Sequence, residues 1–303
     1  MQPQAQYDLL LQICKDFSKD MFNSRGNVPR KAGRPSKCSD LQIIALSIFQ
    51  ESLNMGSERF FFEYLLKALP SLCQQVGTRR NYNARRRKLT SYIEAIRRRM
   101  VVRLNDYYGS QIMVVDSMPL PSCRYSRSKR CKIFKETSTG WPQYGYCATQ
   151  QQRYYGYKFH CVCSASGIIQ MYDLSPANVH DIHYLKDVKE VISNCVLIGD
   201  KGYRSNPMRA ELFEFFGIEL AVPCRSNELL QYTMPADYAK IRKRIEIIFS
   251  QLVDQMDIRK NYAKSQSGLH VRIISKVTLF TMLQYINMKK EKQINHIRYA
   301  LVA

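Results

Sequence analysis

The stretch QIMVVD, residues 111–116, decides the fold, because it is a short apolar run that ends in an acid. A run of this length is typical of a buried strand. A second stretch of the same kind, CVLIGD, occupies residues 195–200. Side chains that leave the carboxyl ends of neighbouring strands in an α/β sheet lie in the crevice where ligands bind. We therefore expect Asp116 and Asp200 to lie close together.

Further strands and helices are indicated around these two runs. Residues 157–163 (YKFHCVC) alternate apolar and polar side chains, and residues 167–174 follow a Ser-Ala-Ser-Gly turn, which together indicate a hairpin. A helix at 181–192 then precedes the second acid-ending run, and another helix and the strand IELAVP follow it. Strands that give way to alternating strand and helix predict a mixed α/β sheet.

Two carboxylates at one crevice repel each other unless a cation lies between them. Hard oxygen ligands select Mg²⁺ or Mn²⁺ over zinc, and DNA phosphates would supply the remaining ligands. An Asp at the end of a strand is also a common turn former or helix cap. The two acids alone therefore leave a metal site and a turn as open interpretations.

A third acid lies on a predicted helix over residues 237–258. Tyr238, Arg242 and Glu246 are spaced i, i+4, i+8, so they share one face of this helix. The buried face is marked by Ile245, Ile248, Phe249 and Leu252. Glu246 is either a positioned functional acid or half of a surface ion pair with Arg242.

The chain carries 46 Lys and Arg residues against 25 Asp and Glu residues, a formal net charge of +21. Self-repulsion of this size favours a polyanionic partner such as a nucleic acid, with a membrane surface as the rival. No secretory signal is recognisable, the apolar stretch 271–288 is short and charged enough to be a buried helix, and ten cysteines occur without any CxxC. We expect a cytoplasmic protein with reduced thiols, no membrane span and no zinc finger.

Cations are densest in the N-terminal part, where ten lie between Arg79 and Arg103 against the single acid Glu94. The helical pattern there keeps an apolar face for packing, and the other face either contacts DNA or is an ordinary solvated face. Solvated charged helices normally mix both signs, so the scarcity of acids favours DNA. The residues we assign to this contact are Arg85, Arg86, Arg87 and Lys88. Upstream, RKAGRPSK at 30–37 is either a minor-groove arm or a solvated linker, and Ser39 with Gln42 predicts a capped helix start near Asp40.

Between the two strand-end acids, residues 120–156 combine cations with aromatic side chains. This composition suits either a segment that holds an unpaired DNA end by stacking or an ordinary surface loop with partly buried tyrosines. Lys158 and His160 alternate onto one face of a strand and are expected to hold a scissile phosphate. Asn178, His180 and Asp181 are expected to form a turn and helix cap.

Several motifs together resemble a known family. VVDSMPLP, YYGYKFH, PANVHD, GDKGY and RKRIEIIFSQL occur in the order and approximate spacing of the DDE transposases of bacterial insertion sequences, and the chain looks closest to the insertion sequence 982 family. GRPSKCSDLQIIAL, SERFFFEYL and YNARRRKL extend the resemblance to about residues 33–285.

The resemblance implies an RNase H-like catalytic core preceded by a helical DNA-binding region. It places the acidic triad, and with it the metal ligands, at Asp116, Asp200 and Glu246, and adds Lys201, Tyr238 and Arg242 as DNA contacts. One departure is plain: related enzymes often carry a Lys seven residues after the Glu, where this chain has Val253.

The expected organisation is a helical DNA-binding region (1–105), an RNase H-like catalytic domain (106–260) with the basic aromatic insertion at 120–156, and a C-terminal helical extension (261–303). The implied function is cleavage at insertion-sequence ends and strand transfer into target DNA by two-metal phosphoryl transfer with Mg²⁺ or Mn²⁺. A homodimer on DNA, associated with the bacterial nucleoid, is expected. The rivals are an RNase H-like nuclease or resolvase without strand transfer, and an inactive DNA-binding repressor.

Overall fold

The computed structural model describes residues 2–29, 36–136, 140–148, 150–224 and 234–301. The chain divides into two compact units, one combining residues 1–104 with 252–303 and the other comprising residues 105–251. We call them the helical unit and the sheet unit. Most of the predicted basic arm, residues 30–35, lies outside the described residues.

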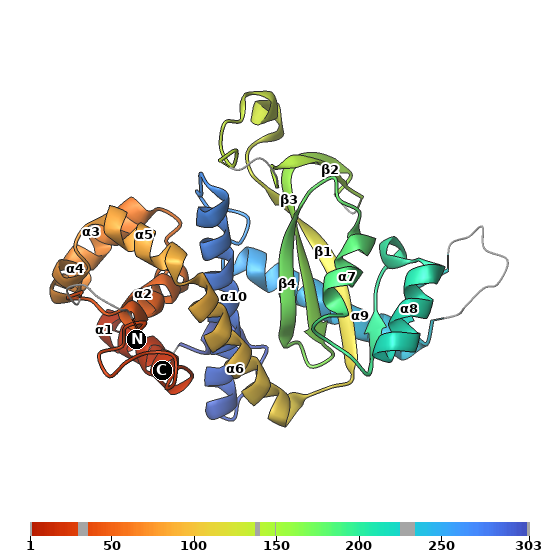
Figure 1. Ribbon diagram of the computed structural model, residues 1–303, viewed down its shortest axis with the longest axis horizontal. Coiled ribbons are helices and arrows are strands. Elements are labelled where there is room, and N and C mark those ends of the chain that lie inside the picture. The colour runs from red at the N-terminus through yellow and green to blue at the C-terminus, as the bar shows by residue number, and fades with distance from the viewer. Residues whose placement is uncertain (1, 30–35, 137–139, 149, 225–233, 302–303) are drawn as a thin grey trace. The chain divides into compact units, whose positions relative to one another are not determined.

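The sheet unit is organised around a six-stranded mixed sheet among its described residues (Figure 1). The strand order is β2-β3-β1-β5-β6, and β4 also pairs with β3. Pairing is antiparallel among β1 to β4 and parallel from β1 through β5 to β6. The strands are β1 (Ile112–Pro121), β2 (Gln143–Cys147), β3 (Gln152–Ser164), β4 (Ile169–Pro176), β5 (Cys195–Ile198) and β6 (Ile218–Ala221). The predicted mixed α/β fold of RNase H-like type is confirmed, whereas β2 was not predicted.

Helices connect and cover the later strands. They are η2 (Asp181–Tyr184), α7 (Leu185–Val188), η3 (Lys201–Tyr203), α8 (Asn206–Phe216) and α9 (Ala236–Asp254). The predicted helix at 181–192 is shorter than expected, because a 3-10 turn occupies its start and α7 has one turn. This short connection still buries Tyr184, Leu185 and Val188 in one core with Val115 of β1 and Leu197 of β5.

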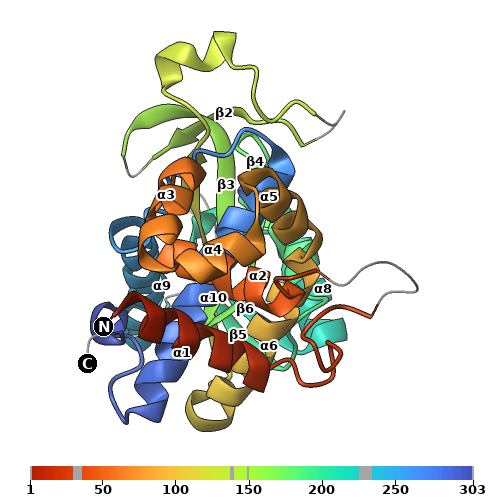
Figure 2. The same cartoon turned by 90° about the vertical axis from the view of Figure 1, so that its left-hand side faces the viewer.

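The helical unit is built around two helices from opposite ends of the chain, and Figure 2 looks onto its N-terminal part. Its α-helices are α1 (Pro3–Asp16), α2 (Asp40–Ser52), α3 (Glu58–Ala68), α4 (Pro70–Val76), α5 (Arg79–Lys88), α6 (Thr90–Tyr108, whose last turn passes into the sheet unit) and α10 (Gln266–Lys289). The predicted start of α2 is confirmed, because the Ser39 side chain and Gln42 form both bonds of a capping box.

Helix α10 forms the centre of the helical unit and is buried over most of its length, including Val271, Ile274 and Phe280. It contacts α2 and α5 (Figure 1). Residues 261–303 are therefore not a separate extension but belong to the same unit as the N-terminal helices. No described helix combines the length and the apolar character that a bilayer span requires.

Candidate active site

Asp116 lies on β1, the strand that pairs with both β3 and β5. Its Oδ1 accepts a hydrogen bond from the backbone N–H of Ser117 at 2.7 Å. Burial raises the pKa of Asp116 to about 7, with repulsion from Asp200 and Asp181 acting in the same direction. The Ser117 N–H and the Arg242 guanidinium oppose this shift without cancelling it. A carboxylate whose charge is disfavoured in this way gains stability from a bound cation.

Asp200 follows β5 and begins η3, where its Oδ1 accepts a hydrogen bond from the backbone N–H of Gly202 at 2.8 Å. Because β5 runs parallel to β1, Ile198 lies opposite Val114. Asp200 and Asp116 each follow these paired residues by two positions. The register therefore brings both acids to the same level of the two neighbouring strands. Asp116 does not end its strand as predicted, because β1 continues to Pro121 and Asp116 pairs with Cys161 of β3.

The two residues that end η3 border the same space. A Cβ on Gly202 would lie 2.9 Å from Asp200 Oδ1, so a larger residue here would displace that carboxylate, and 3.6 Å from Asp181 Oδ2, an ordinary contact. Tyr203 is fully buried, and its hydroxyl has no hydrogen-bond partner within the described part of the chain. Burial raises the pKa of Tyr203 well above its usual value, and three nearby acids, including Asp116, add to this. The Tyr203 hydroxyl therefore stays protonated and can donate a hydrogen bond to a buried water.

Asp181 is a further acid near Asp116, and its contacts there were not predicted from the sequence. His180 caps η2 as expected, accepting from the Ile182 N–H. The Asp181 carboxylate, however, accepts from Ser117 Oγ at 3.0 Å and from Lys158 Nζ at 2.9 Å. These two bonds tie η2 to β1 and β3 beside Asp116. The PANVHD motif contains Asp181, but its pattern predicts only a turn and a helix cap.

Lys158 and His160 share a face of β3, and both lie near Asp181. Lys158 also donates to the Val179 carbonyl at 2.9 Å. His160 is 2% exposed, stacks on Tyr184 at 4.8 Å, and lies with Nδ1 3.9 Å from Asp181 Oδ1. Burial lowers its pKa to about 4, so the ring is neutral at pH 7. Phosphate binding by these two residues stays a prediction, and the contacts described here are internal.

Helix α9 carries the third predicted acid. Ile245 and Ile248 are buried, and Phe249 packs edge-to-face on Phe159 of β3 at 6.2 Å, which fixes the helix on the sheet. Arg242 Nη2 lies 3.6 Å from Glu246 Oε1, with 37% and 54% of the two side chains exposed. Arg242 thus interacts with Glu246 and, through its charge, with the acid on β1.

Two of the three predicted metal ligands, Asp116 and Asp200, lie where a divalent cation could bind them. Asp116 and Asp200 offer hard oxygen ligands whose mutual repulsion a metal ion would relieve. Across the residues that the structure describes, no group of three His, Cys, Asp or Glu side chains lies close enough together to hold an ion. The structure therefore brings Asp116 and Asp200 onto neighbouring strands, and the place of Glu246 as the third metal ligand stays a prediction.

Residues 107–282, more than half of the chain, match the family of transposase DDE domains. The chain belongs to this family. No curated protein and no solved structure matches it. Members of the family are enzymes of DNA cleavage and transfer in transposition, and DDE transposases generally use divalent metal ions.

A transposase binds DNA, and two of the α5 cations predicted to contact it have internal partners. Arg85 Nη2 pairs with Asp40 at 2.6 Å. Arg86 is 2% exposed, donates to Gln50 at 3.0 Å and pairs with Glu58. A buried, paired guanidinium of this kind holds helices together, so the predicted DNA contact of Arg86 is not supported.

Arg87 and Lys88 on the same helix are exposed, as is Lys201 of η3. Their side chains are accessible to a phosphate backbone, and their contact with DNA stays a prediction. The insertion at 120–156 places Tyr144 against Tyr155, with ring centroids 4.9 Å apart, and leaves Tyr146 60% exposed. Its role at a DNA end also stays a prediction.

Proposed function

We propose that this enzyme is the transposase of a bacterial insertion sequence, most similar to those of the insertion sequence 982 family. It cuts DNA at the ends of its element and joins the freed 3′ ends to target DNA. The observation that carries the proposal is the pair of acids on adjacent parallel strands, Asp116 within β1 and Asp200 just beyond the end of β5, where burial and the charge of Asp200 raise the pKa of Asp116 to about 7. An unbalanced pair of this kind is typical of a metal-dependent phosphoryl-transfer site.

Asp116, Asp200 and Glu246 are proposed to hold two Mg²⁺ or Mn²⁺ ions. When bound, such ions make an oxygen nucleophile more reactive and stabilise the leaving oxygen of an in-line displacement. Glu246 would have to exchange its contact with Arg242 for the ions, and its 54% exposure leaves it free to do so. Arg242 would then be released toward the DNA backbone.

The other residues around the acids position neighbouring side chains, donate hydrogen bonds or neutralise charge. Asp181 fixes Lys158 of β3 and Ser117 of β1, and thereby the protein backbone beside Asp116. The buried Tyr203 hydroxyl would donate a hydrogen bond to a water molecule beside the acids, since no described group accepts it. Exposed Lys201, next to Asp200, neutralises a neighbouring phosphate.

The test uses a labelled DNA taken from the ends of the element that encodes the protein, incubated with Mg²⁺ or Mn²⁺ and an unlabelled target. Wild-type protein should yield both cut ends and joined products. Asp200→Asn should lose both products while binding DNA normally, and the matched control Asp187→Asn, on an exposed acid of α7, should retain both. Cutting without joined products would indicate a nuclease or resolvase instead, and binding without any cutting would indicate a repressor.

We also propose that the protein acts on DNA as at least a dimer, because two element ends require two active sites held together. Light scattering on a complex with paired ends should give two or more chains. A mass that corresponds to one chain would contradict this.

A further inference from the structure

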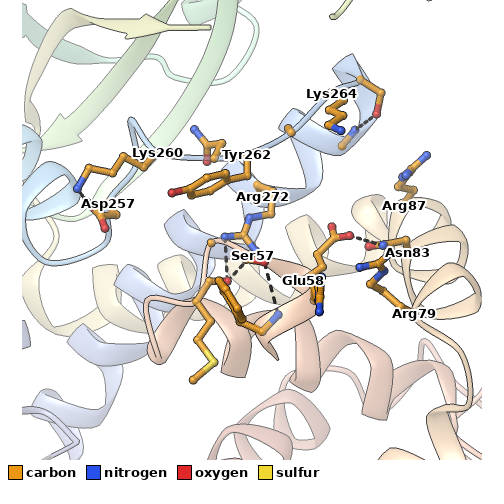
Figure 3. A pocket seen from close by; sticks show the side chains of 18 of the residues that line it. Ser57, Glu58, Arg79, Asn83, Arg87, Asp257, Lys260, Tyr262, Lys264 and Arg272 are labelled. Atoms are coloured by element: carbon orange, nitrogen blue, oxygen red, sulfur yellow. Dashed lines mark hydrogen bonds and ion pairs between the residues drawn. The ribbon is translucent and has the colours of Figure 1, made fainter. Parts of the chain in front are cut away.

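A large groove lies within the helical unit and shares no residue with the acid site. It is lined by α3, α5, the turn at 54–57 and the segment at 257–265 (Figure 3). Its volume of about 1280 Å³ exceeds the roughly 300–1000 Å³ of most small-molecule sites. An extended ligand therefore fits it better than a metabolite does.

The lining of this groove is strongly cationic. Its charged members are the cations Arg59, Arg79, Arg80, Arg87, Lys260, Lys264, Arg272 and Lys276 and the acids Glu58 and Asp257. Arg79, Arg80, Arg87 and Lys264 are exposed and form no ion pair with any residue that the structure describes. Four cations left without a counter-charge around one groove favour a polyanion.

An aromatic ring projects among these cations. Tyr262 is 75% exposed, and its ring lies against the backbone of Gly56, where an added Cβ would lie 2.8 Å from Tyr262 Cδ2. Its backbone has φ +50°, a left-handed conformation that is unfavourable for a tyrosine and is retained only where the surroundings impose it. A flat ring held in this way beside cations is typical of sites where a nucleic-acid base stacks.

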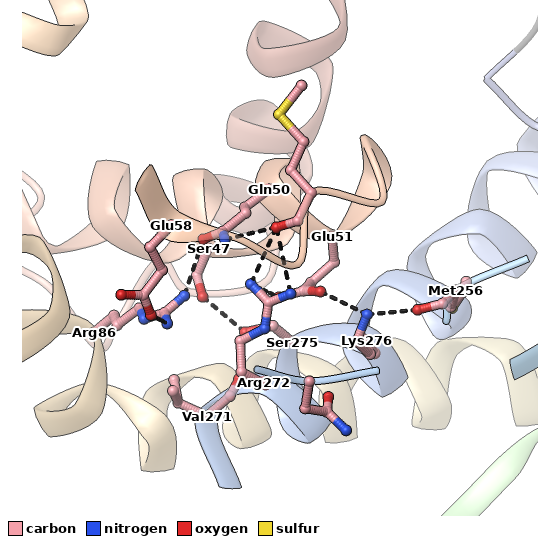
Figure 4. A network of polar contacts seen from close by, with 12 residues as sticks. Ser47, Gln50, Glu51, Glu58, Arg86, Met256, Val271, Arg272, Ser275 and Lys276 are labelled. Atoms are coloured by element: carbon pink, nitrogen blue, oxygen red, sulfur yellow. Dashed lines mark hydrogen bonds and ion pairs between the residues drawn. The ribbon is translucent and has the colours of Figure 1, made fainter. Parts of the chain in front are cut away.

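The rims of the groove are held by one buried charged cluster (Figure 4). Glu51 is fully buried between Arg272 at 3.0 Å and Lys276 at 2.8 Å. Arg272 donates to the Met55 carbonyl beside Gly56, and Lys276 donates to the Met256 carbonyl on the opposite rim. The turn that supports Tyr262 and the segment that carries it are therefore fixed to the same two helices, α2 and α10.

We propose that this groove binds the DNA of the element end, with phosphates on Arg79, Arg80, Arg87 and Lys264 and an unpaired terminal base stacked on Tyr262. The inference rests on the proposed function, since that function identifies the DNA. In this proposal DNA binding also requires residues 257–276, because residues 1–105 supply only one side of the groove.

The experiment measures binding of full-length protein to a labelled duplex end by fluorescence anisotropy over a range of salt concentrations. The double variant Arg87→Ala/Lys264→Ala should bind about ten-fold more weakly at moderate salt. The slope of log K against log salt concentration should become shallower by about 1.8, the value for two lost phosphate contacts. The matched control is Lys67→Ala/Lys289→Ala, which removes two exposed cations of the same unit that do not line the groove.

Stacking is tested with the same duplex carrying a short 3′ single-stranded overhang. Tyr262→Ala should weaken binding of the overhang DNA about ten-fold and leave the blunt duplex unchanged, whereas Tyr262→Trp should retain binding. If the double variant bound as tightly as the control and with the same salt slope, the groove would not be the DNA-binding site. Wild-type protein that binds through the groove but never cuts would instead overturn the proposed function alone.

Discussion

The chain buries charge in two regions and balances it differently in each. In the helical unit, Glu51 lies between Arg272 and Lys276, so the carboxylate and its two partners are compensated inside the protein. In the sheet unit, Asp116 lies near other acids, and its pKa is raised to about 7 because burial and repulsion exceed the opposing effects.

The difference separates structural charge from charge that awaits a ligand. A buried group whose partners come from its own chain contributes to one defined arrangement of helices. A buried group left with excess like charge destabilises the fold until a counter-ion arrives, and such sites are concentrated where proteins bind and react. The exposed cations of the groove are likewise an excess of like charge, here positive instead of negative.

The largest effect should follow from breaking the compensated cluster. Glu51→Gln leaves Arg272 and Lys276 buried without a negative partner, so we expect the free energy of unfolding to fall by about 3–5 kcal/mol. Urea unfolding followed by circular dichroism measures this. The control is Glu63→Gln, whose pair with Arg59 is exposed and should contribute less than about 1 kcal/mol. Equal effects of the two substitutions would contradict the structural role of Glu51.

A smaller effect should follow at the uncompensated site from Asp181→Asn. The amide keeps the shape but removes the negative acceptor for Lys158 and Ser117, so single-turnover cleavage should slow roughly 10–100-fold. DNA affinity should change little. Asp181→Glu should restore part of the rate, because it restores the charge. A normal rate for Asp181→Asn would show that these contacts are not used in the reaction.

The parts of the fold that were predictable depend on local patterns. The apolar runs before Asp116 and Asp200 are strands, and Ser39 with Gln42 starts a helix, because burial and capping act over a few residues. Strand β2 was missed because QYGYC has no apolar alternation. Gly145 lets the backbone of β2 lie close to Ala177, since a Cβ at position 145 would lie 2.8 Å from the Ala177 Cβ.

Contacts between distant segments were not predictable. No local pattern indicates that α10 completes the N-terminal helices, because that depends on Glu51 meeting Arg272 across the chain. The different burial of Arg86 and Arg87 could be predicted in part from the sequence. Tyr82, Arg86 and Leu89 recur at helical spacing, and all three are buried. The proximity of Asp181 to Asp116 likewise arises only when η2 folds back onto β1.

The smallest expected effect is a gain in stability from Asp116→Asn in the presence of EDTA. The folded protein binds the Asp116 proton with a pKa of about 7, against an ordinary value of 3.8. The folded state therefore holds more protons than the unfolded state between about pH 4 and 7, so ionisation of this group lowers stability as pH rises through that window. The variant avoids this loss, so its advantage should be absent near pH 4 and larger at pH 8 than at pH 5.

Urea unfolding of both proteins at pH 5 and pH 8 measures the difference, from which the titration of His160 cancels because both proteins carry it. Asp187→Asn, on an exposed acid of the same unit, is the control and should show no growth with pH. Addition of Mg²⁺ should then stabilise the wild-type protein more than Asp116→Asn, since only the former retains the full negative donor set. A variant that is less stable than wild type at pH 8 without metal would mean that the charge of Asp116 is compensated by the chain, as that of Glu51 is.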